Sequence, residues 1–365
     1  MSQYIFILVW LFIMGIIGFI IPVERYENVF GKNELRVTWI YAICMFLPVI
    51  IMASLRKDIG DTYAYQLMFK NLPTTFGGLI SYLPHVTKDK GFTVLGGLIK
   101  IIFGNSTIIY FSILAIIQGI GLVAIYRKYS SNYWISIFLF IASSDYLSWM
   151  FNGIRQFTAV SIIFAATPLM LKKKWISLII IILFAATIHG SALLMLPIVF
   201  VVQGKPWNKK TIGFIVLCIA VLVFANQFTN VLETLLSDTQ YTNVVSDWKQ
   251  INDTGTNYIR VLVYSVPMLL AFIGRKWLED EDNQVINLCI NMSIITSGLY
   301  LVSAVTSGVF IGRLPIFTSL YSYILMPYII DQMFTAKSAR LIKIVMIGLY
   351  LIFYYYQIHI AWTLI

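Results

Sequence analysis

Apolar stretches of about 18 or more residues recur along almost the whole of this 365-residue chain. Each of them, as a helix, is long enough to cross the roughly 30 Å hydrocarbon core of a bilayer. A helix satisfies its own backbone hydrogen bonds in lipid, and no segment here alternates between apolar and polar residues as a barrel strand does. The pattern therefore predicts an all-α, polytopic integral membrane protein.

The composition agrees with a chain that lies mostly in lipid. Hydrophobic residues make up 59% of it and charged residues only 12%, and the mean hydropathy of +0.83 is far from that of a soluble globular domain. The apolar stretches leave no room for a separate soluble domain. We therefore expect one membrane domain over residues 1–365, built from about 10–12 helices.

The individual spans can be placed to within a few residues. One stretch, 175–203, would reach about 43 Å as a single helix, and it is interrupted by His189-Gly190-Ser191 and by Pro197. We predict two short arms bent at the His-Gly-Ser sequence, as a re-entrant hairpin or as two tilted spans. The other predicted spans are 4–22, 35–55, 106–126, 133–150, 157–171, 211–229, 258–274, 284–306, 314–332 and 341–362.

The distribution of basic residues predicts the orientation. With the bent version of 175–203, most of the lysines and arginines fall on one side, which the positive-inside rule assigns to the cytoplasm. Both chain ends and the loops 56–105 and 230–257 then face the extracytoplasmic side. The net charge of +10 is explained by these orientation signals, so no nucleic-acid partner is indicated.

Four arginines fall at the outer ends of different predicted spans. Arginine near the membrane interior is retained mainly where it faces a cavity, pairs with an anion or reaches the interface. A guanidinium binds phosphate oxygens through two parallel hydrogen bonds, so a convergent set would suit a lipid-linked diphosphate. The alternative is that each arginine only anchors its helix end among the head groups. The four are Arg56, Arg155, Arg260 and Arg313.

Other polar residues surround these positions in the sequence. His189 lies at the predicted helix break beside Ser191, where a watery cavity or a buried hydrogen bond would each explain it. Asn152 and Gln156 flank Arg155 and are expected to orient it. The stretch "SLRKDIGDTYAYQLMF" adds Asp61 and Tyr65, which a solvated loop would also carry. "EDED" at 279–282 is expected to be a solvated helix end, not a metal site.

Four motifs together resemble the EpsG family, a branch of the Wzy-type bacterial polysaccharide polymerases. They stand in the family's order, and a weaker fifth follows. "GDTYAY" departs from the family pattern, although its glycine, aspartate and last tyrosine fit. The motifs are "RKDIGDTYAY" at 56–65, "KGFTVLGGLIK" at 90–100, "FNGIRQFTAVSI" at 151–162, "ATIHGSALLMLP" at 186–197 and, fifth, "GRLPIF" at 312–317.

The resemblance implies an extracytoplasmic glycosyltransferase of the bacterial plasma membrane with a GT-C-like fold. Its donor and acceptor would be undecaprenyl-diphosphate-linked oligosaccharides, and a flippase and a chain-length regulator would be its partners. On this hypothesis no metal or other cofactor is required, because arginines neutralise the leaving diphosphate. The product would be an exopolysaccharide, a capsule or an O-antigen.

The candidate residues take specific roles on that hypothesis. Arg155 is the first choice for the diphosphate, assisted by Arg56 and Arg313, with Arg260 as a further candidate. His189 is the preferred base for the acceptor hydroxyl, and Asp61 is the second. The groups expected to support them are Asn152, Gln156, Ser191 and Tyr65.

Two other classes of function remain open at this stage. A transporter or flippase for lipid-linked oligosaccharides would use the same arginines without chemistry, but it predicts repeated halves, and no convincing internal repeat is present. A glycan ligase or an O-acyltransferase is the third possibility. An O-acyltransferase also uses a membrane histidine, yet no accompanying pattern supports it here.

Overall fold

The computed structural model describes residues 2–29, 32–57, 59–237, 239, 241–278 and 283–364, and these are predominantly helical. The acidic run at 279–282 lies outside the described residues. Contacts divide the chain into two compact units, Met1–Ala192 with Met333–Ile365 and Leu193–Gln332, which are described separately.

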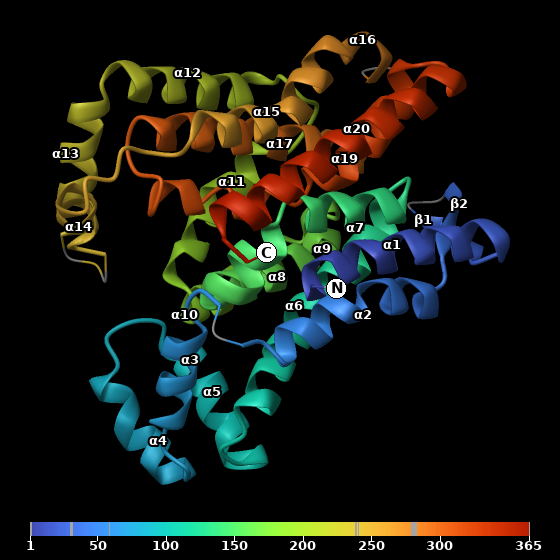
Figure 1. Cartoon of the computed structure of the whole chain (residues 1–365). Coiled ribbons are helices and arrows are strands. Elements are labelled where there is room, and N and C mark those ends of the chain that lie inside the picture. The colour runs from blue at the N-terminus through green and yellow to red at the C-terminus, as the bar shows by residue number, and fades with distance from the viewer. Residues whose placement is uncertain are drawn as a thin grey trace. The chain divides into compact units, whose positions relative to one another are not determined.

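The first unit contains eleven of the described α-helices, one hairpin and short 3-10 and π turns (Figure 1). The elements are α1 (Gln3–Ile20), β1 (Glu24–Val29), β2 (Lys32–Val37), α2 (Trp39–Ser54), α3 (Thr62–Lys70), α4 (Phe76–Tyr82), η1 (Leu83–His85), α5 (Lys90–Phe103), α6 (Thr107–Tyr129), α7 (Tyr133–Ala142), η2 (Tyr146–Asn152), α8 (Ile154–Ala165), α9 (Thr167–Leu171), α10 (Trp175–Ile188), α20 (Ala336–Tyr356) and η5 (Gln357–Ala361). The 3-10 turn η3 (Gly190–Leu194) follows α10 and leads into the second unit.

The second unit begins within η3. Its elements are α11 (Met195–Val201), α12 (Lys209–Val223), α13 (Ala225–Leu236), α14 (Val244–Gln250), α15 (Tyr258–Ile273), α16 (Arg275–Leu278), α17 (Gln284–Ala304), η4 (Ile311–Arg313), α18 (Ile316–Ser319) and α19 (Ser322–Met333).

The prediction of a helical membrane protein is confirmed in its coarse form. Among the described residues, four helices are long and apolar enough to cross a membrane, or up to six if each of two bent pairs is one span. Five further apolar helices are shorter. The larger number of spans, like the single domain, stays a prediction.

Helix α6 forms the centre of the first unit, where it packs against α2 and α8. Its glycines permit the close approach. A Cβ at Gly121 would lie 2.7 Å from the backbone oxygen of Ser161 on α8, and one at Gly119 would lie 2.8 Å from Ile50 on α2. Small residues let helix backbones pack closely in membranes, where lipid provides no hydrophobic force between helices.

The predicted span over 133–150 is a bent pair of helices. The helix breaks after Ala142, and the chain bends by 69° into the π-helix η2. Ser144 lies at the break with a φ of 61°, in the left-handed region. A π-helix is rare and is frequently found near a functional site. Here η2 ends at Asn152, the first residue of the Asn-Gly-Ile-Arg-Gln motif.

A two-stranded antiparallel sheet corrects the expectation of a purely helical chain. Strands β1 and β2 pair in register from Glu24 opposite Val37. Glu27 forms an ion pair with Arg127 at the end of α6, and this guanidinium holds the pKa of the Glu27 carboxyl below its ordinary value. Arg36 donates to the carbonyl oxygen of Lys128 at 2.7 Å, so the hairpin is attached to the end of α6.

The stretch 56–105, predicted as a loop, is mostly helical, since α3, α4 and α5 lie within it (Figure 1). One buried lysine, Lys100 on α5, joins two of these helices. Its Nζ donates to the carbonyl oxygens of Phe69, Lys70 and Leu72 at 3.3, 2.6 and 2.6 Å. These carbonyl groups lie at and just beyond the C-terminal end of α3, so the ammonium gives them a donor and complements the helix dipole.

The predicted helix break at His-Gly-Ser is confirmed. Helix α10 ends at Ile188, and His189 is extended with φ −153° and ψ 117° before η3 begins. The path of the chain on the two sides of this break stays a prediction, because α10 and α11 belong to different units.

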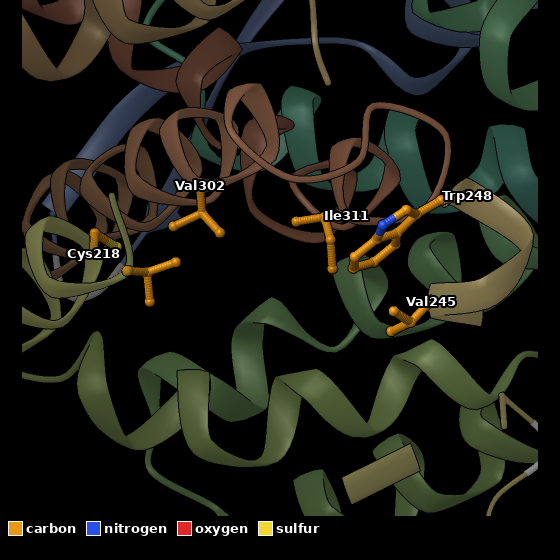
Figure 2. Close-up of a cluster of buried hydrophobic side chains, with 6 residues drawn as sticks. Cys218, Val245, Trp248, Val302 and Ile311 are labelled. Atoms are coloured by element: carbon orange, nitrogen blue, oxygen red, sulfur yellow. The ribbon is translucent and has the colours of Figure 1, made fainter. Parts of the chain in front are cut away.

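The second unit is built around α17, which packs against both α12 and α15. Figure 2 shows part of its apolar core, where Trp248 of α14 lies beside Ile311 of η4. The predicted span 211–229 breaks at Phe224, and the chain turns by 105° into α13. Cys218 is buried in the same core.

Candidate functional site

The carboxylate of Asp89 joins two of the sequence motifs within the first unit. Its Oδ2 accepts a hydrogen bond from Nη1 of Arg155 at 2.9 Å, and its Oδ1 accepts one from the backbone amide of Gly190 at 3.3 Å. Asp89 directly precedes α5, Arg155 lies in the first turn of α8, and Gly190 follows α10. The beginnings of two helices and the end of a third therefore meet at one carboxylate.

Close backbone packing brings α5 to the same place. A Cβ at Gly91 would lie 2.8 Å from the backbone carbon of Thr187, near the end of α10. Backbone cannot give way as the end of a flexible side chain can. Gly91, the first glycine of "KGFTVLGG", thus lets the start of α5 approach the segment that carries His189.

The "RKDIGDTYAY" motif reaches this cluster through Tyr65. The guanidinium carbon of Arg155 lies 6.0 Å from the centre of the Tyr65 ring, at the outer limit of a cation–π contact. The same ring packs edge-on against Phe92 of α5 at 6.0 Å. Gly60 has a φ of +54°, and a Cβ there would lie 2.8 Å from Oδ1 of Asn152. Four of the five motifs therefore supply residues to one region.

Arg56 is buried between two aromatic rings, not exposed at a helix end. Its guanidinium carbon lies 4.2 Å from the centre of the Phe111 ring and 4.9 Å from that of Phe151. Nε donates to the carbonyl oxygen of Ala53 and Nη1 to that of Met150, each at 2.7 Å. Arg56 thus holds the end of α2 to the π-helix η2.

Two guanidinium nitrogens in this region have no protein acceptor among the described residues. They are Nη2 of Arg56 and Nε of Arg155, and both are buried. An unsatisfied buried donor is costly, and water or a ligand oxygen commonly satisfies it. Arg155 is paired with the carboxylate of Asp89, so Arg56, Arg155 and Asp89 together carry a charge of +1.

His189 makes a short polar contact within its own turn. Its Nδ1 lies 2.7 Å from Oγ of Ser191. His189 is half-buried, and the amide of the next residue is the one bonded to Asp89. The turn that carries His189 and the guanidinium of Arg155 are therefore bonded to the two oxygens of the same carboxylate.

The remaining candidates of the first unit differ in burial. Gln156 is buried within α8. Asp61 is exposed at the start of α3, and its side chain makes no capping hydrogen bond. Asp61 is thus not brought into the contacts around Asp89, and its role as a second base stays a prediction.

Arg260 and Arg313 belong to the second unit, so the convergence of four arginines stays a prediction. Arg260 lies beside aromatic rings, 5.6 Å from the centre of Tyr264 and 5.8 Å from that of Tyr300. Arg313 ends η4 and is exposed.

Asp253 fixes the backbone near both of these arginines. Its Oδ2 accepts from Oγ of Ser307 at 2.6 Å and from the amide of Val309 at 2.9 Å, and its Oδ1 accepts from the amides of Gly255 and Gly308 at 3.0 Å each. Burial raises the pKa of Asp253, but these four donors outweigh that effect and hold the pKa below its ordinary value. The loop before α15 is thereby attached to the turn before η4.

Two residues of the site were missed by the sequence reasoning. Asp89 lies one residue before a quoted motif, so only its position could have drawn attention to it. Gln118 is buried on α6, and its Nε2 donates to the carbonyl oxygen of Ile154 at 3.2 Å and to Oγ1 of Thr158 at 3.0 Å. It supports the first turn of α8, which carries Arg155. A polar residue in an apolar run was its only signal.

The part of the chain that the structure describes contains no group of three or more His, Cys, Asp or Glu side chains able to hold a metal ion. The absence of a metal requirement stays a prediction.

The fold and this cluster define a helical membrane protein whose motif residues meet around an arginine–aspartate pair. The chain belongs to the EpsG family, whose model matches residues 39–363 and thus nearly the whole chain. This family is associated with Wzy-type polysaccharide polymerases, and it points to a glycosyltransferase-like polymerase in polysaccharide biosynthesis. No curated protein and no solved structure matches the chain.

Proposed function

We propose that this protein is a polysaccharide polymerase that joins undecaprenyl-diphosphate-linked oligosaccharide repeat units. The observation that carries the proposal is the cluster around Asp89, in a chain of the EpsG family. This cluster combines a cation suited to a diphosphate with a histidine suited to a hydroxyl group. The residues around Asp89 come from four motifs that are far apart in the sequence. A purely local structural role would not explain why these motifs meet at one place.

The reaction transfers the growing glycan from its lipid carrier. The bond between the anomeric carbon and the diphosphate oxygen breaks, and a new bond forms between that carbon and a hydroxyl oxygen of the next lipid-linked unit. Undecaprenyl diphosphate leaves with the bonding electrons. Arg155 binds the developing negative charge, which is the interaction that most lowers the barrier in such a transfer. Arg56 contributes its positive charge from a buried position.

His189 accepts the proton of the attacking hydroxyl. For that role Nδ1 carries a proton and donates a hydrogen bond to Oγ of Ser191. Nε2 is then the basic nitrogen of the ring. Tyr65, Asn152 and Gln156 support Arg155, and Arg313 and Arg260 are further candidates for binding a diphosphate. No metal or cofactor takes part.

The reaction takes place at the outer face of the bacterial plasma membrane, on a GT-C-like fold. This location is supported by the apolar helices and by the distribution of basic residues, most of which lie in the loops assigned to the cytoplasm. A flippase supplies the lipid-linked units, and a chain-length regulator acts on the product.

Reconstitution tests the proposal. Purified protein in nanodiscs is given lipid-linked repeat units extracted from cells that lack it, and the products are separated by size. We expect a ladder of polymers and the release of undecaprenyl diphosphate. In proteoliposomes, movement of intact units between the leaflets without any ladder would overturn the proposal and favour a flippase.

A further inference from the structure

Asp89 departs from the local behaviour of an aspartate that precedes a helix. At this position the side chain usually accepts a hydrogen bond from the first turn, but Asp89 makes no such bond to α5. Its φ of 54° is also in the left-handed region, which is unfavourable for a residue with a side chain. Local strain of this kind persists only where the surrounding contacts determine it, and it is concentrated at functional sites.

The strained conformation turns the carboxylate away from its own helix. One oxygen then binds Nη1 of Arg155 and the other binds the amide of Gly190. The Asp89 side chain is only 7% exposed, whereas that of Arg155 is 38% exposed. A buried anion thus orients a cation that solvent or substrate can reach.

We propose that Asp89 is a positioning residue of the transferase, which sets both the orientation of the Arg155 guanidinium and the position of the His189 turn. The inference rests on the proposed function and adds a role for Asp89 to it. Asp89 does not contact the substrate. It occupies Nη1 of Arg155, so the diphosphate binds the exposed part of the guanidinium that Asp89 leaves free.

This role predicts opposite changes in binding and in catalysis. Asp89→Asn removes a negative charge beside the arginine, so the site becomes more positive and binds diphosphate more tightly. The same substitution releases Arg155 and the His189 turn from their fixed positions, and the chemical step slows because it depends on their geometry. A merely structural residue would lower the amount of active protein and leave the affinity of the remaining protein unchanged.

The variants Asp89→Asn, Asp89→Ala, Arg155→Ala and the double alanine variant are purified in nanodiscs. The control is Asp247→Asn, which neutralises an exposed carboxylate on α14. Two quantities are measured for each. One is kcat for ladder formation from the extracted lipid-linked units, and the other is the affinity for undecaprenyl diphosphate alone.

We expect Asp89→Asn to lower kcat about tenfold or more. Its affinity for undecaprenyl diphosphate should rise about threefold, as the loss of one nearby charge predicts. The double alanine variant should be slower than Arg155→Ala by less than the effect of Asp89→Ala alone, because the part of that effect that acts through Arg155 is already lost. Asp247→Asn should match the wild type in both measurements.

Three results would overturn the inference. The first is an unchanged kcat in Asp89→Asn, and the second is a loss of activity in Asp89→Asn with unchanged or weaker affinity for undecaprenyl diphosphate. The third is a double alanine variant that is slower than Arg155→Ala by the full effect of Asp89→Ala. Failure of the proposed function gives a different result, because the wild type itself would then form no ladder. The proposed role of Asp89 would be refuted together with that function.

Discussion

Replacing Arg56 by methionine should destabilise the protein strongly, because the structure gives this arginine a clamping position. The substitution keeps a long unbranched side chain but removes two hydrogen bonds, to the carbonyl oxygens of Ala53 and Met150, and two cation–π contacts. Hydrogen bonds from a charged donor contribute about 1.5–3 kcal/mol each, and cation–π contacts about 1 kcal/mol each. Relief from burying the charge offsets several kcal/mol of this sum, which leaves a net loss of about 3 kcal/mol.

Thermal unfolding of the detergent-purified protein, followed by tryptophan fluorescence, measures this loss. A change of that size should lower the melting temperature by about 5 °C in a chain of this length. Arg155→Ala is the comparison, because its guanidinium is partly exposed and forms one ion pair, so its loss should cost less than that of Arg56. If Arg56→Met melts at the wild-type temperature, the clamping role is refuted, and loss of polymer in that variant would have to be chemical.

Three further predictions follow from particular contacts. Lys100→Met should lower the free energy of unfolding by about 2 kcal/mol, because three carbonyl groups at the end of α3 lose their donor, and hydrogen exchange there should accelerate. Asp253→Asn should lower the melting temperature at pH 7. Since the folded pKa of Asp253 is depressed, this difference from the wild type should be complete above the unfolded pKa of about 3.9 and should shrink as the pH falls through the folded pKa. Gly91→Ala should reduce polymer formation by separating α5 from α10, whereas Gly77→Ala, with open space around it, should not; equal activity of these two would contradict the close packing.

Features set by local sequence were predicted well. The apolar runs identified the helical membrane class, and the polar interruption at His189 identified the end of α10. Both follow from rules that need no tertiary contact, namely the hydrophobic length of a span and the poor helix propensity of Gly190 and Ser191. The motifs around Arg155 and His189 also led to the correct family.

Features set by tertiary contacts were not predicted. The left-handed conformation of Asp89 is maintained by partners on α8 and beyond α10, which are 66 and 101 residues away. The burial of Arg56 depends on rings from α6 and η2. No local sequence pattern predicts such tertiary contacts. The hairpin was missed because its strands are short and highly charged: β1 carries charges on both faces, and the only apolar residues of β2 are Leu35 and Val37.

The most direct test of the central claim is the polymer profile of cells that carry Arg155→Ala or His189→Ala, compared with the wild type at matched levels of membrane-inserted protein. We expect both variants to accumulate single lipid-linked repeat units and to form no ladder. Ladders of normal length from either variant would contradict the assignment of that residue to the transfer reaction, and normal ladders from both would refute the proposed site.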